Sequence, residues 1–226
     1  MVGSHDLKYI FIHNPKTAGN SIKKQLFGRP TLNTGIFQTM KKNQPGDPKL
    51  LEDSTTRVGI SVHAYADIAK EYLEENNLDW DSYYSFGFVR NPFERCISSY
   101  FFWKRKIDND EPLSPENTIL ANNIYNTPIE KYIHHFNQHQ YHWFYDHKTC
   151  SNLLVDFVGK FENIQEDFKE VVLKINPDAT EEDWKLSHKN QSVHKHYTEY
   201  FTKKDVEKFS EKFAVDLELF DYKFGD

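Results

Sequence analysis

The chain has 226 residues, of which 38% are hydrophobic, 15% aromatic and 27% charged, with a formal net charge of −6 at pH 7. This length suffices for one sizeable core, and the aromatic content argues against an intrinsically disordered chain. The acidic balance disfavours a general nucleic-acid-binding protein, no segment has the roughly 20 apolar residues of a membrane span, and two cysteines are too few for a disulfide framework.

The first expected element is a β-strand over residues 7–13, a β-rich apolar run that ends before Pro15. A helix is expected over 22–27, ending at Gly28. Residues 29–56 are rich in proline and glycine and are expected to form a long loop, which inside a compact domain is usually functional or mobile.

The rest of the chain alternates strands with helices. Further strands are expected over residues 58–62, 83–89 and 153–158. Further helices are expected over residues 64–75, 93–106, 115–124, 128–137, 163–175 (capped by Asn163) and 203–213. This alternation predicts an α/β fold with a central, mostly parallel sheet flanked by helices, in a single domain over residues 1–226.

The turn over residues 13–21 has the composition of an anion site. A helix that begins directly after a strand offers unpaired backbone N–H groups and the positive end of its dipole. Gly19 allows close approach to the backbone, Lys16 adds a cation, and Thr17 and Ser21 add hydroxyl groups. Because Lys16 precedes Gly19, the Walker A order is absent and an ATP-hydrolysing P-loop is not expected. An ordinary strand–helix turn with a solvated lysine is the alternative.

A second candidate anion site follows the strand over 83–89. Arg90 stands at the carboxyl end of this strand, where ligands of open α/β sheets bind, and Ser98 follows about two helical turns later. A guanidinium and a hydroxyl so placed can hold one phosphate from two sides. In the alternative, Arg90 pairs with a neighbouring carboxylate and Ser98 has no special role.

Together, the two segments resemble those of the PAPS-dependent sulfotransferases, specifically the carbohydrate-type (sulfotransferase family 2-like) branch. Residues 15–21 are similar to that family's 5′-phosphosulfate loop, and residues 88–95 with Ser98 and Tyr100 resemble its 3′-phosphate motif. Later segments agree in the same order, over residues 158–163, 167–168, 190–192 and 216–222. The resemblance covers nearly the whole chain and implies a P-loop-like, nucleotide-binding sulfotransferase fold.

The resemblance implies that the sulfuryl group of 3′-phosphoadenosine 5′-phosphosulfate (PAPS) is transferred by in-line displacement, with 3′-phosphoadenosine 5′-phosphate (PAP) as product. The residues that it assigns to donor binding are Lys16, Thr17, Ala18, Gly19, Asn20, Ser21, Arg90 and Ser98. Lys16 is also expected to be catalytic, because charge develops on the leaving phosphate oxygen. No metal is expected, since the sulfuryl group carries little charge.

The acceptor needs a general base, and His63 is the expected one. It ends the predicted strand over 58–62, relatives carry a histidine ahead of a helix there, and a pKa near ~6.5 suits proton removal. A capping or partly buried histidine is the alternative for His63, and His13 is the alternative base.

His135, His139 and His142 would share one helical face, but a zinc site is disfavoured because no cysteine or carboxylate accompanies them at ligand spacing. A polar wall facing the substrate is expected there instead.

Two other functions remain open from the residues alone: a nucleotide-dependent phosphoryl-transfer enzyme and a non-catalytic glycan-binding module on the same scaffold. The expected acceptor is a glycan or a small hydroxylated metabolite, with no nucleic-acid partner. Residues 190–192 are expected to cover the donor or to form a solvated loop, and they also form a glycosylation sequon. We expect a cytoplasmic protein, or one in the Golgi lumen if an N-terminal anchor has been removed.

Overall fold

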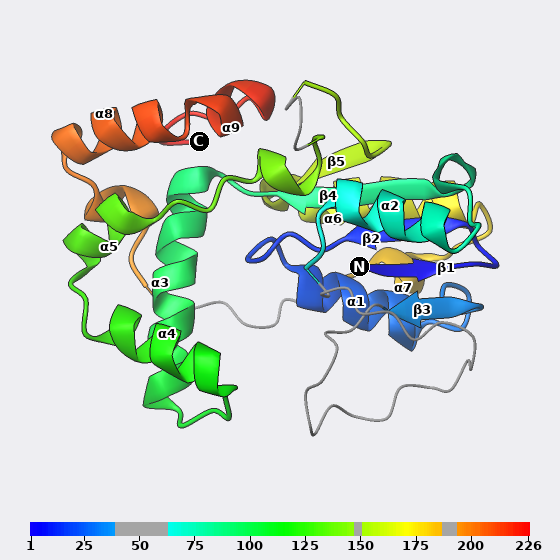
Figure 1. The fold of residues 1–226 in the computed structure, drawn as a ribbon, viewed down its shortest axis with the longest axis horizontal. Coiled ribbons are helices and arrows are strands. Elements are labelled where there is room, and N and C mark those ends of the chain that lie inside the picture. The colour runs from blue at the N-terminus through cyan, green and yellow to red at the C-terminus, as the bar shows by residue number, and fades with distance from the viewer. Residues whose placement is uncertain (39–62, 147–150, 187–193) are drawn as a thin grey trace. The chain divides into compact units, whose positions relative to one another are not determined.

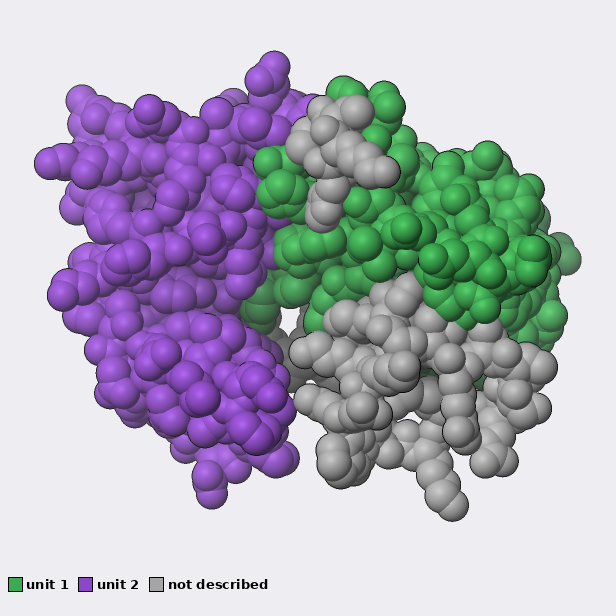
Figure 2. Space-filling model, in the orientation of Figure 1, with its two compact units in different colours: residues 1–89, 141–188 green, residues 90–140, 189–226 purple. Residues whose placement is uncertain are grey.

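The computed structural model describes residues 1–38, 63–146, 151–186 and 194–226 (Figure 1). It divides into two compact units, which Figure 2 distinguishes by colour: unit 1 comprises residues 1–89 and 141–188, and unit 2 comprises residues 90–140 and 189–226. The strand predicted over 58–62 and the segment 190–192 lie outside the described residues.

Unit 1 is built on a five-stranded sheet with the strand order β3-β1-β2-β4-β5. The strands are β1 (Val2–Ser4), β2 (Tyr9–Ile12), β3 (Ile36–Gln38), β4 (Tyr84–Val89) and β5 (Phe157–Lys160). β2 pairs in parallel with β4, and β4 with β5, whereas β1 is antiparallel to both β2 and β3. Among the described strands β1 alone therefore runs against the others, and the predicted α/β fold with a mostly parallel sheet is confirmed.

The helices of unit 1 are α1 (Gly19–Gly28), α2 (Ala66–Glu75), α6 (Ile164–Ile175) and the short α7 (Glu181–Trp184). In α6, Phe168, Val171 and Val172 are buried at the spacing of one helical face. They pack with Ile22 and Leu26 of α1 in one apolar cluster. The strands contribute alternate residues to this cluster, namely Tyr9, Phe11, Phe86 and Phe88. One face of the sheet is therefore covered by α1 and α6.

Unit 2 is helical in its described part. Its helices are α3 (Pro92–Asp108), α4 (Pro115–Tyr125), α5 (Ile129–His135), α8 (Lys203–Lys212) and α9 (Ala214–Leu219). The caps explain where several of them begin. The side chain of Asn91 accepts a hydrogen bond from Phe93 N and precedes Pro92 at the first helical position, and Thr202 forms a capping box with Asp205. Aromatic rings fill the core, with Phe209 4.7 Å from Phe93 and 4.4 Å from Phe213 between centroids.

Several elements differ from their predicted positions. The strand predicted over 153–158 begins at Phe157, because Leu154 N donates to Phe144 O and Asp156 is bonded to Ser85. Part of the predicted loop over 29–56 forms β3, and β1 precedes the first predicted strand. Asn163 occupies the N-cap position of α6, but its side chain makes no capping hydrogen bond.

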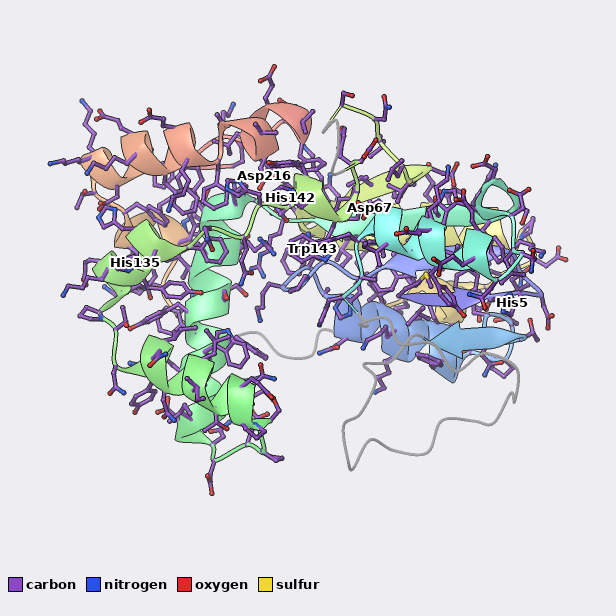
Figure 3. All side chains as sticks on the ribbon, viewed as in Figure 1. His5, Asp67, His135, His142, Trp143 and Asp216 are labelled. Atoms are coloured by element: carbon purple, nitrogen blue, oxygen red, sulfur yellow. The ribbon has the colours of Figure 1, made fainter. Side chains whose placement is uncertain are left out.

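The helix predicted over 128–137 ends at His135, so His135, His139 and His142 do not share a helical face. Lys212 Nζ donates to the carbonyl oxygens of His134 and Phe136, at 2.7 and 2.9 Å, and so satisfies the end of α5. Figure 3 labels His135 and His142 on separate elements. Within the described ranges, no group of three or more His, Cys, Asp or Glu residues has the arrangement of a metal site, and no helix has the length and apolarity of a membrane span.

The Phe86 ring is a test of the sheet core. It is fully buried and stacks on Phe11 with 5.3 Å between ring centroids. We expect Phe86→Ala to lower the free energy of unfolding by about 3–5 kcal/mol, since a large cavity is left. Ile68→Ala, at a residue of α2 that is 41% exposed, should change it by less than about 1 kcal/mol. Urea unfolding of both variants measures the difference, and equal losses would contradict this description of the core.

Candidate functional site

The turn from β2 into α1 has an unusual backbone. Lys16 and Ala18 have left-handed conformations, with φ of 70° and 61°. Side chains disfavour this region, so the surroundings must hold the turn in place. Thr17 Oγ1 donates to Asn14 O at 2.8 Å, and Asn14 Nδ2 donates to the main-chain oxygen of Phe88 in β4 at 3.0 Å. The buried side chain of Asn14 therefore ties the predicted anion loop to β4, and the Thr17 hydroxyl is engaged within the turn.

The start of α1 has the features of an anion site. Ala18, in the left-handed region, precedes Gly19, the first helical residue, and such a pair turns successive N–H groups toward one side. The N-cap residue Ala18 makes no side-chain capping hydrogen bond, and the first turn of α1 holds no acidic residue. Asn20 is exposed and Ser21 is half-buried at this end of the helix. The residues predicted to bind one phosphate, 16–21, are thus gathered around the positive end of α1.

Gly19 is required by packing. A Cβ atom there would lie 1.9 Å from Cδ2 and 2.0 Å from Nε2 of His13. The His13 ring is only 5% exposed and stacks on Phe11 with 5.7 Å between ring centroids. Burial holds the pKa of His13 well below its usual value, and the neighbouring His63 adds to this effect. His13 is therefore a neutral residue packed against the helix start, and its burial leaves the ring little access to an acceptor.

His63 lies directly beside His13. Their ring centroids are 4.4 Å apart, and His63 Nδ1 is 3.0 Å from the main-chain oxygen of His13. Because a carbonyl oxygen only accepts hydrogen bonds, Nδ1 carries the proton and Nε2 of the neutral ring carries the lone pair. Desolvation of the ring lowers the pKa of His63, the hydrogen bond to the His13 carbonyl opposes this, and the positive charge of Lys23 adds to the lowering. The side chain remains exposed. At neutral pH it is thus a base with Nε2 as its basic atom.

The second predicted site lies in unit 2. Arg90 directly follows β4, and its Nη1 donates to Ser98 Oγ at 3.1 Å, so the predicted pair does meet. Its Nη2 also donates to Glu94 Oε1 at 2.7 Å. Arg90 therefore contacts both the Ser98 hydroxyl and a neighbouring carboxylate, and the carboxylate contact is the one that the alternative interpretation expects. Glu94 is that carboxylate, and its position one helical turn after Arg90 is visible in the sequence.

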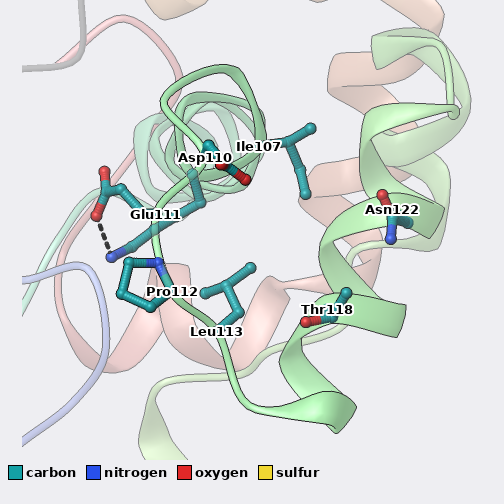
Figure 4. Close-up of a pocket in the computed structure, with 8 residues that line it drawn as sticks. Ile107, Asp110, Glu111, Pro112, Leu113, Thr118 and Asn122 are labelled. Atoms are coloured by element: carbon teal, nitrogen blue, oxygen red, sulfur yellow. Dashed lines mark hydrogen bonds and ion pairs between the residues drawn. The ribbon is translucent and has the colours of Figure 1, made fainter.

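A cavity of about 400 Å³ lies elsewhere in unit 2, beside the end of α3 and the start of α4 (Figure 4). It is lined by Lys106, Ile107, Asp110, Glu111, Pro112, Leu113, Thr118 and Asn122. Lys106 and Glu111 form an ion pair in its wall. None of the predicted site residues lines it, so we assign it no part in donor binding.

A protein-family model described as "Sulfotransferase family" matches residues 1–223. The chain belongs to the sulfotransferase family. It is therefore an enzyme whose sulfuryl donor is PAPS, as this family implies, and the alternatives of phosphoryl transfer and non-catalytic glycan binding give way. This sulfotransferase is also similar to an uncharacterised protein of Archaeoglobus fulgidus, with 33% identity over 96 residues, which are 42% of this chain and 70% of that protein. No solved structure is significantly similar.

The packing of His13 on Gly19 can be tested inside a single helix. We expect Gly19→Ala to lower the free energy of unfolding by at least about 1 kcal/mol, because the added methyl group meets the buried ring. Gly28→Ala is the matched control, since an added Cβ at that end of α1 has no atom within 4 Å. It should leave stability unchanged or raise it by up to about 1 kcal/mol. If chemical denaturation showed the same change for both variants, the close contact would be wrong.

Proposed function

We propose that this sulfotransferase belongs to the carbohydrate-type branch and transfers the sulfuryl group to a hydroxyl group, or an amine, of a carbohydrate or small hydroxylated metabolite. The observation that carries the proposal is the start of α1: a left-handed turn with a lysine and no acidic residue, beside a histidine set up as a base. The branch rests on the resemblance of residues 15–21 and 88–95 to its two donor motifs.

The 5′-phosphosulfate of the donor is assigned to residues 16–21. Their main-chain N–H groups and the Lys16 ammonium would hold its phosphate, and the residues present fit an anion because the helix dipole there meets no opposing carboxylate in the first turn. As the bond between sulfur and the bridging oxygen breaks, negative charge grows on the departing phosphate. Lys16 and the helix start would stabilise that charge more than they stabilise the ground state, which is what lowers a barrier.

The 3′-phosphate is assigned to Arg90 and Ser98. The guanidinium already donates to Ser98 Oγ, so one bound phosphate oxygen would meet both groups. Glu94 holds the same guanidinium from a second nitrogen and fixes its orientation. This phosphate takes no part in bond breaking. Its binding energy would serve to fix the donor so that the sulfur is open to in-line attack.

His63 is assigned the role of general base. Its Nε2 would take the proton of the acceptor hydroxyl while the acceptor oxygen forms the new bond to sulfur and the bridging phosphate oxygen leaves with the electron pair of the broken bond. The products are the sulfated acceptor, PAP and a protonated His63, which returns its proton to solvent. The bond from His63 Nδ1 to the His13 carbonyl keeps the tautomer that this step requires.

We further propose that residues 1–226 act as one catalytic domain, since the family match spans both units, and that the enzyme works in the cytoplasm. Buried Cys96 is a free thiol, which suits a reducing compartment.

Lys16 and Arg90 should have separable kinetic roles. With PAPS and a panel of glycans and hydroxylated metabolites, and product mass spectrometry to find an acceptor, we expect Lys16→Ala to lower kcat by about 10²-fold or more. Arg90→Ala should instead raise KM for PAPS with a smaller change in kcat, since it loses binding energy for the remote phosphate. Lys24→Ala and Arg29→Ala, at residues of α1 and just after it, are the matched controls. Wild-type kinetics in both site variants would refute the assignment.

His63 should control the acidic limb of the rate profile. Because its pKa lies below 6.5, the base form persists through neutral pH, and kcat of the wild type should fall only as pH drops below that value. His63→Ala should lower kcat by about 10²-fold or more and abolish this limb. His13→Asn retains the main-chain oxygen that bonds to His63. The kcat of this variant should therefore still fall at acidic pH, while its free energy of unfolding should be lower than that of the wild type. A full limb in the His63 variant would exclude His63 as the base.

A further inference from the structure

Among the described residues of unit 2, four polar ones have 0% of their surface exposed. Asn91 caps α3, and the other three have no such local role: Arg95 in α3, Gln140 between α5 and the end of this part of unit 2, and Asp216 in α9. Burying a polar group costs free energy unless the group is hydrogen-bonded, so the hydrogen-bond partners of these residues indicate what they do. Asp216 is labelled in Figure 3.

Gln140 makes two hydrogen bonds with the main chain of a single residue, Arg90. Its Oε1 accepts from Arg90 N at 2.9 Å, and its Nε2 donates to Arg90 O at 2.7 Å. A side-chain amide is one of the few groups that offers a donor and an acceptor side by side, and here it acts as a neighbouring strand would. Both polar groups of the Arg90 main chain are thereby fixed, and with them the direction in which its side chain departs.

Gln140 is itself held by charge. Its main-chain N–H lies 2.8 and 3.0 Å from the two carboxylate oxygens of Asp216. The nearby guanidinium of Arg95 donates through Nη1 to Gln138 O at 2.6 Å. Burial lowers the pKa of Arg95 to about 10, and the charge of Asp216 opposes that change, so the cation persists at neutral pH. A buried cation and a buried anion therefore hold the segment 138–140 by its main chain.

We infer that Gln140 is a positioning residue for Arg90, and that recognition of the donor's 3′-phosphate depends on it, with Asp216 and Arg95 holding Gln140 in place. This inference rests on the proposed function, which assigns the 3′-phosphate to Arg90. Gln140 would act on donor binding without touching donor or acceptor. A substitution of Gln140 should weaken only the binding of the phosphate that Arg90 contacts, whereas loss of a merely structural residue would weaken the binding of every ligand alike.

The test compares two ligands that differ by that phosphate. Calorimetry gives the affinities for PAP and for adenosine 5′-monophosphate, and their ratio measures the selectivity for the 3′-phosphate. We expect Gln140→Met, which removes both bonds to Arg90 and keeps the length of the side chain, to reduce this ratio at least about fivefold. Its affinity for adenosine 5′-monophosphate should stay within about twofold of the wild type. KM for PAPS should rise while kcat changes little.

The matched control is Gln138→Met, the same substitution at an exposed residue. It removes only the 3.4 Å contact from Arg95 Nη2 to Gln138 Oε1 and keeps the main-chain oxygen that accepts from Arg95 Nη1 at 2.6 Å. Its selectivity ratio should equal that of the wild type. Asp216→Asn is the variant to measure if Gln140→Met does not fold. It keeps an oxygen that can accept from the Gln140 N–H but loses the negative charge. We expect its ratio of affinities for PAP and adenosine 5′-monophosphate to fall, by less than in Gln140→Met.

Equal losses for the two ligands, or no loss, in a folded variant at Gln140 or Asp216 would overturn the inference. A wild type that shows no preference for PAP over adenosine 5′-monophosphate would instead refute the assignment of the 3′-phosphate to Arg90. The two failures are thus distinguishable.

Discussion

The packing of the His13 ring in the space that a Cβ atom of residue 19 would occupy constrains the geometry of the first anion turn. The ring occupies the space that any side chain at residue 19 would need, so β2 and α1 can meet only at a glycine. Burial beneath the helix start keeps His13 neutral, and the same residue presents its carbonyl oxygen to His63. One packing contact thereby links the backbone that would face the leaving phosphate to the tautomer of the proposed base.

The two proposed phosphate sites rest on different physical means. Around α1, the attraction comes mainly from main-chain N–H groups and the helix dipole, which need no long side chain to be ordered. At Arg90 it comes from a guanidinium, whose direction must be fixed by other groups. Glu94 and Ser98 contact its end, and Gln140 fixes its main chain. The cost of burying Arg95 and Asp216 is offset by hydrogen bonds, which is the condition under which a buried network stiffens a site.

Local sequence signals suffice to predict β4, α3 and the anion turn, because strand-forming runs, prolines at helix starts and the glycine at position 19 act over a few residues. They miss β1 and β3, which are three residues each; β1 pairs with the neighbouring β2 and with β3, and the pairing with β3 joins distant parts of the chain. The contact of Arg90 with Ser98 and Glu94 follows from helical spacing. Gln140 offers no such signal, since its partner is 50 positions away. The groups that bind can therefore be predicted, while the residues that hold them in place require the fold.

The most direct measurement of the central claim is nuclear magnetic resonance of protein labelled with [¹⁵N]glycine, which reports on the nine glycine amides of the chain. Assigned by substitution and titrated with PAP, the resonance of Gly19 should shift strongly, because its N–H group would face the bound 5′-phosphate. The resonance of Gly28, at the other end of α1, should stay in place. Saturable binding of PAP that leaves the Gly19 resonance unmoved would contradict the account, since the donor would then lie away from the start of this helix.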